Sequence, residues 1–570
     1  MNRREFLALA PAAGLLSRSS SPSWYEKSFY LLHEDYHTLE TDEVGKEADP
    51  EETARLIALS KPDVIQIHAK GNPGWTSYPT KIGHTPPKLA RDEMEVWSGV
   101  ARKHGYAFSA YYNIGRDGEI MKRRPEWNRQ KADGSLYERA LCYHSGVAEA
   151  YLWPMVEEIM DRYRPNGFWF DGSCFTVAVC YCPRCKQRFR REKNLDAPRS
   201  PEEPGWADYK EMQRAIYREF LHQTARRIKS KDPDCLVCVN WAYSLIMPEP
   251  VDDALDYLSG DRGGDVDVLS ADAHWYDGQG KPFDLMTNVR LSPTGESKPP
   301  EQIEQEMAVI NANGGRFFLW DNPTRAGGLQ RDKQEFAGKV VAPFLRARQK
   351  WCLGSVNVPD VSLLYSSADH YAATLKNPTV FLRAAQRSHA PGDELVKAHL
   401  TYEFVNDRRM LAGDVRGRLL LLNSPLALSP GVEEAVKRYE SGGGKVLRVS
   451  ALDRQAFEKA IPERERGVTT NAPETVEVSL RRLQNVHVVH LVNRAKGNRQ
   501  KLDGNPGAGS TRITGIPPVA RCKVSVRTSS RPRKVTIEPG GARAAWKWRN
   551  GRAEVEVPQF PIHCMVVLES

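Results

Sequence analysis

The sequence predicts a (β/α)8 barrel, followed by a small α/β domain and a C-terminal β-sandwich. Between residues 28 and 323, short apolar segments alternate with longer amphipathic segments, as eight strands and their helices require. Polar and aromatic residues gather where the predicted strands end, which is where barrel enzymes place their active sites. From residue 475 onward, apolar residues occupy every second position between turn residues, a pattern typical of antiparallel strands.

The predicted barrel strands are short and mostly apolar. The amphipathic segment from Val147 to Tyr163 is predicted as the helix before the fourth strand. An open, doubly wound sheet is the alternative, but it normally carries a glycine-rich phosphate-binding turn after its first strand, and this sequence has none there. We predict the eight strands at Phe29–Leu32, Asp63–His68, Ala107–Tyr112, Gly167–Asp171, Leu236–Asn240, Val266–Ser270, Met286–Val289 and Phe317–Trp320.

The rest of the chain changes its pattern twice, and we predict domains at residues 24–355, 356–460 and 470–570. Predicted strands in the middle domain, such as Val361–Tyr365 and Leu419–Leu422, alternate with helices and indicate a parallel sheet. This domain resembles the glutamine-amidotransferase-like domain found beside the barrels of β-galactosidase-type enzymes. No Cys/His pair lies where that fold would act, so we expect a structural role or a homo-oligomer contact.

The first residues are typical of a twin-arginine export signal, which we place at residues 1–23. Arg3 and Arg4 are followed by Phe6-Leu7, a short apolar run and a serine-rich stretch. The apolar run is too short to remain in a bilayer as a spanning helix. We therefore expect a periplasmic or secreted protein that leaves the membrane once the signal is cleaved.

Charge and aromatic content indicate the class of partner. The net charge of +9 is small against 81 basic and 72 acidic residues, and no basic block with interleaved aromatics stands out, so nucleic acid is not an expected partner. Thirteen Trp and 21 Tyr are a generous supply of aromatic rings, which suit sugar rings as well as protein cores. In the last domain, Trp546 and Trp548 share one strand face, an arrangement more typical of a core than of a sugar-binding platform.

Two carboxylates follow predicted strands four and six. Gly167-Phe168-Trp169-Phe170 leads directly into Asp171, and Asp272 follows the sixth strand. Glycoside hydrolysis needs two carboxyl groups that flank one bond, one of them attacking or activating water and the other protonating the leaving oxygen. We predict Asp171 and Asp272 as the catalytic pair, with Asp267 and Asp321 as rival acids.

A polar sugar pocket also needs side chains that hold hydroxyl groups and rings that stack on the sugar. Residues of both kinds end several predicted strands, although each is also compatible with a structural hydrogen bond or with core packing. The predicted substrate-binding residues are His33, Glu34, His68, Trp75, Tyr112, Trp241, His274, Trp275 and Asp321.

Trp169-Phe170-Asp171-Gly172 resembles the nucleophile motif of the α-L-fucosidase family of glycoside hydrolases. The segments His68–Tyr78 and His104–Tyr112 are also similar to that family. The resemblance covers residues 28 to about 325 and implies a retaining hydrolase in which Asp171 is the nucleophile and a later carboxylate, commonly a Glu, is the acid/base. The chain also resembles bacterial glycosyl hydrolase-like proteins with a Cys-rich insertion and two further domains. Because Asp272 stands where a Glu is expected, a non-catalytic carbohydrate-binding protein on a degenerate barrel is the alternative. A different enzyme that uses the strand-end histidines, such as a deacetylase or lyase, ranks last because the sequence shows no metal triad.

Four cysteines, Cys174, Cys180, Cys182 and Cys185, lie within twelve residues just after predicted strand four. Four thiolates suit a structural zinc ion, whereas export favours two disulfides, and buried free thiols are the third alternative. The remaining cysteines, including Cys142, are predicted to be core residues. No His/Asp/Glu triad for a catalytic metal is visible, so we expect catalysis to need no cofactor.

Overall fold

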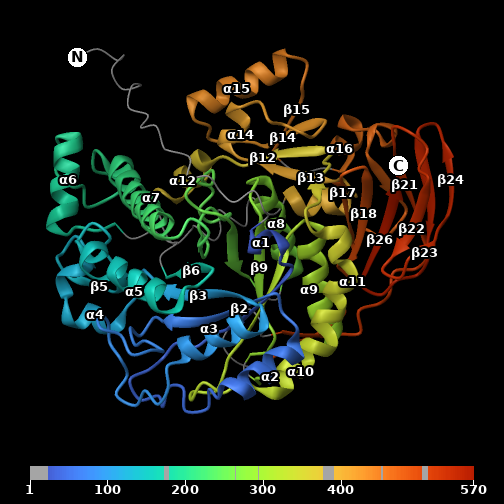
Figure 1. The fold of residues 1–570 in the computed structure, drawn as a ribbon. Coiled ribbons are helices and arrows are strands. Elements are labelled where there is room, and N and C mark those ends of the chain that lie inside the picture. Colours follow the sequence, from blue (N-terminus) through green and yellow to red (C-terminus); the bar gives the residue numbers. More distant parts are fainter. Residues whose placement is uncertain are drawn as a thin grey trace.

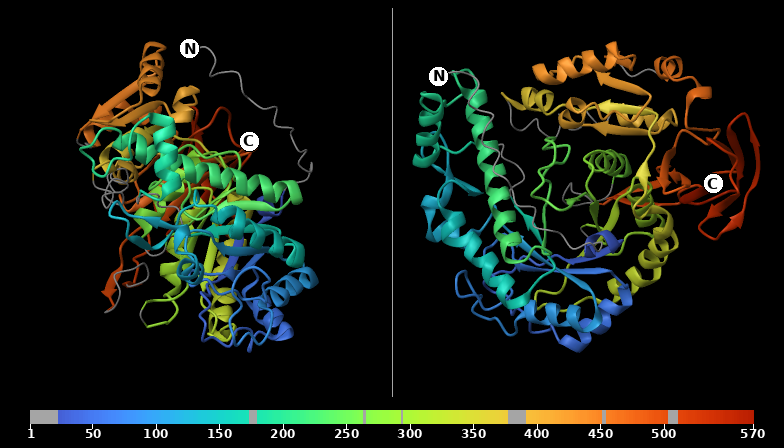
Figure 2. Two further views of the ribbon diagram at one scale, coloured as in Figure 1. Left: turned by 90° about the vertical axis from the view of Figure 1, so that its left-hand side faces the viewer. Right: turned by 45° about the horizontal axis from the view of Figure 1, so that its top comes forward.

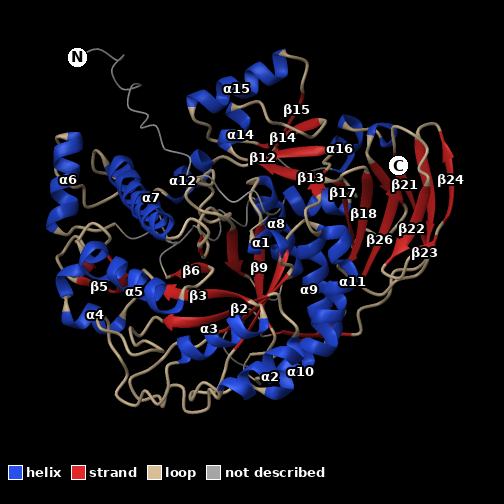
Figure 3. Ribbon diagram, viewed as in Figure 1, coloured by secondary structure: helices blue, strands red, loops and turns tan. Residues whose placement is uncertain are grey.

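The computed structural model describes residues 23–172, 179–262, 265–292, 294–376, 391–450, 454–502 and 511–570. The ribbon contains a barrel, a small α/β region and a C-terminal β-sandwich (Figure 1, Figure 3). Within these ranges, no helix combines the length and the apolar character that crossing a membrane requires. Residues 1–22 of the predicted signal segment lie outside the described residues, and so does Cys174.

Eight parallel strands form the barrel, in the order β7-β6-β3-β2-β1-β10-β9-β8. A parallel bridge between Asn240 and Ser259 joins the two ends of this sheet. The predicted fold class is therefore confirmed. The strands are β1 (Tyr30–Glu34), β2 (Val64–Lys70), β3 (Ala107–Asn113), β6 (Gly167–Asp171), β7 (Leu236–Val239), β8 (Leu258–Asp261), β9 (Phe283–Asn288) and β10 (Arg316–Asp321).

Local signals set the ends of the surrounding helices. Asp49 caps the first of them by accepting hydrogen bonds from the N–H groups of Glu51 and Glu52, and Pro50 takes the first helical position. Gly105 ends the next one in the left-handed conformation, at φ 77°. The helices include α2 (Pro50–Ser60), α3 (Glu93–His104), α5 (Trp153–Tyr163), α7 (Trp206–Lys231), α8 (Val266–Gly278), α9 (Pro300–Ala312), α10 (Arg331–Phe336) and α11 (Ala342–Cys352).

The prediction of strand six at Val266–Ser270 is wrong, because these residues begin helix α8. The alternation of Val and Asp at 266–268 imitates a strand, but the Asp265 side chain accepts a hydrogen bond from the Asp267 N–H and caps a helix. The sixth barrel strand is β8, which has only four residues and contains Gly260 and Asp261, two weak strand formers.

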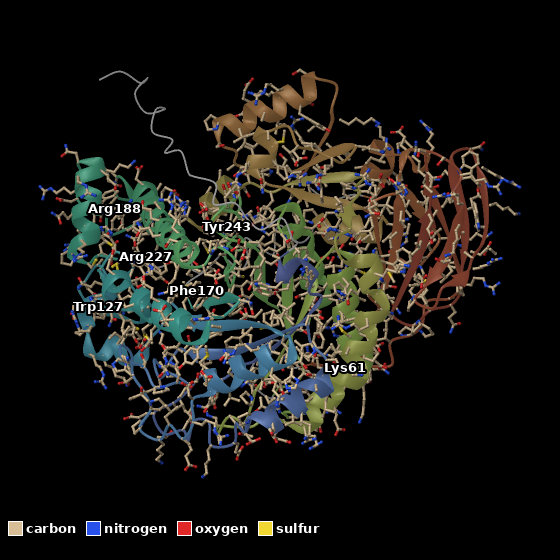
Figure 4. All side chains as sticks on the ribbon, in the orientation of Figure 1. Lys61, Trp127, Phe170, Arg188, Arg227 and Tyr243 are labelled. Carbon is tan, nitrogen blue, oxygen red and sulfur yellow. The ribbon has the colours of Figure 1, made fainter. Side chains whose placement is uncertain are left out.

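Side chains alternate between the barrel interior and the helix layer along each strand. Phe170, next to Asp171, packs in the large cluster that includes residues of the outer helices (Figure 4). The strand that carries it therefore sends Trp169 and Asp171 inward, toward the barrel axis. The cluster inside the barrel contains Leu31, Val64, Tyr111, Trp169, Leu236, Cys238, Met286 and Phe318.

The middle region is a four-stranded parallel sheet, and the last region consists of two antiparallel sheets. The parallel sheet runs β13 (Tyr402–Val405), β12 (Val361–Leu364), β14 (Leu419–Asn423), β15 (Lys445–Val449). One sandwich sheet runs β11 (Val356–Asn357), β17 (Val476–Leu483), β18 (Val486–Asn493), β26 (His563–Glu569), β22 (Lys534–Glu538), β23 (Ala542–Arg543). The other runs β16 (Val468–Thr470), β21 (Cys522–Arg527), β25 (Arg552–Val557), β24 (Ala545–Arg549).

Helices α8 and α9 attach both of these regions to the flank of the barrel (Figure 2). His274 of α8 stacks on Tyr402 of β13, with ring centroids 3.8 Å apart. Gln305 of α9 donates a hydrogen bond to the backbone oxygen of Asn493 in β18, at 2.7 Å. The middle region also contacts the loop after β7, at the carboxyl end of the barrel, where the Tyr365 hydroxyl donates a hydrogen bond to the backbone oxygen of Leu245 at 3.0 Å.

Candidate active site at the barrel mouth

Asp171, at the carboxyl end of β6, is held by three hydrogen-bond donors from two neighbouring strands. Its Oδ2 accepts from the Tyr111 hydroxyl at 2.6 Å and from Asn113 Nδ2 at 3.2 Å. Its Oδ1 accepts from Asn240 Nδ2 at 2.9 Å. An acceptor-only carboxylate matches this set of donors, which fixes its position between β3 and β7.

The motif that contains Asp171 ends in Gly172, and the structure explains why this position needs a glycine. Its φ is 94°, in the left-handed region that glycine favours. A Cβ atom at this position would lie 2.0 Å from Oδ1 of Asn113, the residue whose amide nitrogen binds Asp171. Glycine is thus required here for both the backbone conformation and the close approach of Asn113.

A second carboxylate, Asp261, ends β8 on the other side of Asn240. Nδ2 of Asn240 lies 2.9 Å from Oδ1 of Asp171 and 3.2 Å from Oδ1 of Asp261. The two carboxylate oxygens are therefore separated by at most the sum of these distances, about 6 Å, close to the spacing of glycosidase carboxyl pairs.

The surroundings of Asp261 favour its protonated form. Although Asp261 is exposed at the mouth, the neighbouring strand ends remove part of the hydration of its carboxyl. This desolvation and then the charge of Asp171 raise the pKa of Asp261 to about 7. Asp261 can therefore carry a proton near neutral pH.

A wall of stacked rings adjoins Asp171. His68 stacks on Tyr111 with ring centroids 3.5 Å apart, and Tyr111 stacks on Trp169 at 5.4 Å. Nε2 of His68 lies 3.0 Å from Oδ1 of Asp35 and 3.3 Å from Nε2 of His33. Burial lowers the pKa of His33 to about 3 and that of His68 to about 4, so both imidazoles are neutral at physiological pH.

Solved structures share this architecture over nearly the whole chain. An α-L-fucosidase (isoenzyme 2) from Paenibacillus thiaminolyticus superimposes with a TM-score of 0.81 at 17% identity, covering 95% of this chain and 99% of that chain. A β-galactosidase from Bacillus circulans sp. alkalophilus has a TM-score of 0.65 at 13% identity, covering 95% and 99%. The chain has the fold of these glycosidases. A β-galactosidase from Rahnella sp. R3 also aligns, with a TM-score of 0.58 at 12% identity and coverage of 96% and 99%. No family model matches the chain, and neither does the sequence of any curated protein.

Of the predicted site residues, the structure brings Asp171, His33 and His68 together at the mouth of this glycosidase-like barrel. Trp241 follows β7 in a left-handed conformation, φ 64°, and the Arg262 guanidinium lies 4.2 Å from its ring centroid. Trp75 is buried in the loop after β2, where it packs edge-on against His84 of the same loop.

Three residues predicted to bind substrate point away from the mouth, because they occupy alternate positions on their strands. Tyr112 donates a hydrogen bond to Sδ of Met155 in helix α5, at 3.4 Å. Glu34 accepts one from Gln334 of α10 at 2.8 Å, and Asp321 forms an ion pair with Arg290. The prediction for Tyr112, Glu34 and Asp321 is therefore wrong.

The prediction that Asp272, His274 and Trp275 follow a barrel strand is also wrong, because all three lie in helix α8. Asp272 is buried and forms an ion pair with Arg262 at 2.5 Å. Nε2 of His274 lies 3.4 Å from a carboxylate oxygen of Glu477 in the sandwich, and the Trp275 indole donates to the backbone oxygen of Tyr243 at 2.6 Å.

The rival acid Asp267 also lies in α8. It forms ion pairs with Arg494 at 2.5 Å and with Lys496, both of the sandwich. It therefore belongs to the contact between the barrel and the sandwich, away from Asp171.

The site residues that the prediction missed are those that face inward beside Asp171. Once Asp171 is known to point inward, the parallel register Tyr111↔Trp169 and Asn113↔Asp171 identifies Tyr111 and Asn113 as its neighbours. Asn240 and Asp261 depend on recognising β8, whose sequence carries a weak strand signal. The missed residues are Asp35, Tyr111, Asn113, Asn240 and Asp261.

Four cysteine sulfurs converge in a second cluster, beside the loop that follows β6. The members are Cys142, Cys180, Cys182 and Cys185, whose Sγ atoms all lie within 4.8 Å of one another. Cys142 thus takes the place that the prediction gave to Cys174, which lies outside the described residues, and Cys142 is not a simple core residue. Every described cysteine is a free thiol.

The cysteine cluster joins two insertions of the barrel. Cys142 directly follows β5 (Leu136–Leu141), the second strand of a hairpin with β4 (Asn128–Gln130). The other three cysteines surround the start of α6 (Pro183–Lys193), and Arg188 of this helix donates hydrogen bonds to both carboxylate oxygens of Glu219 in α7 (Figure 4). The cluster thereby links the segments that follow strands three and four.

Proposed function

We propose that this chain hydrolyses glycosidic bonds by a retaining mechanism, with Asp171 as the nucleophile and Asp261 as the acid/base. The observation that carries the proposal is the amide of Asn240, which bridges the two carboxylates. Their facing oxygens are at most about 6 Å apart, which is compatible with the roughly 5–5.5 Å that separates the carboxyl groups of a retaining pair.

The two carboxylates differ in the way that the two roles require. Asp171 receives three hydrogen bonds as an acceptor, so it is oriented to attack the anomeric carbon. Asp261, with its pKa raised to about 7, protonates the leaving oxygen in the first step. In the second step it takes a proton from the water molecule that hydrolyses the glycosyl–enzyme ester.

The sugar that we propose is an α-L-fucoside. This rests on the Trp169-Phe170-Asp171-Gly172 motif and on the likeness to a solved α-L-fucosidase. Beside Asp171, the Nδ1 atom of the neutral His68 has no hydrogen-bond partner among the described residues, so this nitrogen can bind a sugar hydroxyl that reaches it. The alternative, a non-catalytic sugar-binding barrel, was motivated by the missing Glu, and in our proposal Asp261 takes the role of that acid.

The test is the stereochemistry of aryl α-L-fucoside hydrolysis, followed by proton NMR. We expect release of the aryl alcohol and α-L-fucose as the first-formed anomer. β-L-Fucose as the first product would contradict the short carboxylate spacing and indicate inversion. If no aryl glycoside in a panel of common sugars is cleaved while the chain still binds oligosaccharides, the non-catalytic alternative is correct.

We also propose that the chain is exported after folding, since the N-terminal residues have the features of a twin-arginine signal. Replacing Arg3 and Arg4 by Lys should leave the protein in the cytoplasm at its full length. Fractionation of cells that express each form checks this. Equal export of the two forms would exclude the twin-arginine route.

For the cysteine cluster we propose a structural zinc ion. Cys142 Sγ lies 3.7 Å from both Cys182 Sγ and Cys185 Sγ. With Zn–S bonds of about 2.3 Å, the sulfurs of a tetrahedral site are about 3.8 Å apart. An ion here would hold the hairpin after strand three against α6 and would take no part in catalysis.

Metal analysis of the purified chain tests the zinc proposal, with about one zinc per chain expected. Cys182→Ser should lose the metal, whereas Cys352→Ser, a buried cysteine outside the cluster, should retain it. Thiol titration of the denatured chain without reductant separates the alternatives. A metal-free chain that lacks four reactive thiols would indicate two disulfides.

A further inference from the structure

The β-sandwich contains a cavity of about 700 Å³, and the described residues that line it include none from the barrel. It opens at one end of the sandwich, between the β17–β18 turn of one sheet and the β24–β25 turn of the other. Gln484 and Asn550 of these two turns adopt the left-handed conformation, at φ 53° and 50°, and Gly551 follows Asn550 at φ 72°. The walls therefore belong to tight turns that fix the side chains around the opening.

The lining of this cavity, which we call the arginine cavity, is strongly positive. Arg464, Arg482, Arg527 and Arg552 all line it, and its described lining includes no Asp or Glu side chain. Within the described part of the chain, no carboxylate lies within ion-pair distance of any of the four guanidinium groups. Asp360, Glu463 and Glu554 partly offset the charge of Arg552, and Ser570 brings its terminal carboxyl group to the lining, so the excess positive charge rests mainly on Arg464, Arg482 and Arg527. Cations without ion-pair partners in a concave site raise the local concentration of anions.

The four arginines differ in how firmly they are held. Arg552 donates hydrogen bonds to the hydroxyl and backbone oxygens of Ser525 at 2.8 Å and to the backbone oxygen of Arg466 at 2.8 Å. These hydrogen bonds fix the guanidinium group of Arg552 as a positively charged part of the cavity lining. Arg527 is exposed and donates one hydrogen bond to the backbone oxygen of Arg464, whereas the exposed side chains of Arg464 and Arg482 can turn toward a ligand.

Two further groups suit a sugar more than a bare ion. Trp548 is 38% exposed, and its indole nitrogen donates a hydrogen bond to Thr528 Oγ1, in the cavity lining, at 3.1 Å. The Nδ1 atom of His487, also in the lining, is buried with no hydrogen-bond partner among the described residues. The exposed indole beside the cavity can contact a sugar ring, and the imidazole of the lining has one nitrogen left without a protein partner among the described residues.

The sequence concentrates positive charge in this region. Residues 521–552 contain ten Lys and Arg residues and one acidic residue, Glu538. Their net charge therefore equals the +9 of the entire chain, so the remainder is neutral overall. The positive charge is thus a local feature of the sandwich.

We propose that the arginine cavity binds an acidic polysaccharide. Arg464, Arg482 and Arg527 would take its sulfate or carboxylate groups by paired N–H donors, and Trp548 would stack on an adjacent sugar ring. A compact cavity of this volume suits a short stretch of glycan, whereas nucleic acid is usually bound along a continuous groove that follows its backbone. The proposal goes beyond the hydrolytic function, because the cavity lies entirely outside the barrel.

Affinity electrophoresis of the purified chain tests the proposal, with dextran sulfate, polygalacturonate and neutral dextran as probes. We expect dextran sulfate, polygalacturonate or both to retard the protein, and which of them does so identifies the acidic group. Neutral dextran should not retard it. The double variant Arg482→Gln/Arg527→Gln should bind at least about tenfold more weakly, because it removes two charge-assisted contacts.

A matched variant distinguishes binding in the arginine cavity from nonspecific attraction to the positive charge of the sandwich. Arg521→Gln/Arg543→Gln removes the same charge from exposed positions of the sandwich outside the cavity, and it should bind as the unmodified chain does. Trp548→Ala should weaken binding to the polysaccharide without changing retention on a sulfonate resin. Equal losses in the two double variants would overturn the proposal, as would tighter binding of a single-stranded DNA oligonucleotide at the same ionic strength.

The outcome can be read independently of the proposed hydrolase activity. Thermal unfolding of each variant verifies that it is folded. Where the unmodified chain cleaves an aryl glycoside, Arg482→Gln/Arg527→Gln should cleave it at the same rate. A chain that binds acidic polysaccharide and cleaves nothing would retain this proposal and lose the hydrolytic one.

Discussion

Asp171 and Asp261 end strands on the two sides of β7 and share one amide donor, Asn240, yet their surroundings differ. Asp171 receives two further hydrogen bonds, from Tyr111 and Asn113. Asp261 has the amide of Asn240 and a neighbouring negative charge, and its pKa is raised to about 7. Two chemically identical side chains at the carboxyl end of the barrel thus acquire separate roles from the hydrogen-bond donors and charges around them.

Of the two carboxylates, Asp171 accepts more hydrogen bonds, and its replacement should have the largest effect on activity. Asp171→Asn removes the attacking oxygen, so we expect kcat/KM for an aryl fucoside to fall by roughly 10⁴-fold or more. Asn is nearly isosteric with Asp and still offers one acceptor, so the thermal midpoint should change little. Turnover close to that of the unmodified chain would remove Asp171 from the chemistry.

Asp261→Asn should have a smaller effect that depends on the leaving group. General acid catalysis contributes about 10²–10⁴-fold, so natural linkages should suffer that loss, whereas a dinitrophenyl leaving group needs little protonation. In the unmodified chain, activity should fall as the pH rises through about 7, because Asp261 then loses the proton that it donates. The measurement is the pH dependence of kcat/KM for both leaving groups, and an equal loss on the two substrates would argue against an acid role.

The shared donor can be removed without altering either carboxylate. Asn240→Ala should reduce kcat/KM by about tenfold or more, because charge-assisted hydrogen bonds are worth about 1.5–3 kcal/mol. The hydrogen bond from Asn240 lowers the pKa of Asp261, so its loss should move the alkaline limb of the pH profile to higher pH. A limb that stays in place would show that the amide does not couple the two carboxylates.

The smallest expected effect is on stability. Since the pKa of Asp261 is higher in the folded chain than in the unfolded chain, the folded state binds more protons between about pH 4 and 7, and stability falls as the pH rises through this window. Asp261→Asn removes this loss, so its thermal midpoint should exceed that of the unmodified chain above pH 7. The difference should disappear near pH 4, and a scan at both pH values checks it.

The strands that carry Asp171 and Asp261 also show how much of the site could be predicted from the sequence. Strand four was predictable because three large apolar residues precede Asp171 and glycine follows it. Strand six was not, because β8 is four residues long and the Val-Asp-Val sequence of α8 imitates a strand. Tyr112 was chosen over Tyr111 because the facing of a strand depends on register with its neighbours, which the sequence does not contain.

The cysteine cluster shows a similar limit. The spacing of Cys180, Cys182 and Cys185 points to a ligand loop, but the fourth member, Cys142, comes from a hairpin 38 residues upstream of Cys180. Only the packing of the hairpin against α6 brings it close. Contacts within one segment could be predicted, and contacts between segments required the structure.

The central claim is that Asp261, and not Asp272, is the acid/base partner of Asp171. Azide rescue of aryl fucoside hydrolysis in Asp261→Gly and Asp272→Gly tests it most directly, because a small anion can occupy the space of a missing acid/base and attack the glycosyl–enzyme. We predict that azide restores turnover in Asp261→Gly with formation of α-L-fucosyl azide, and that it has no such effect in Asp272→Gly. Rescue of Asp272→Gly alone would contradict this account.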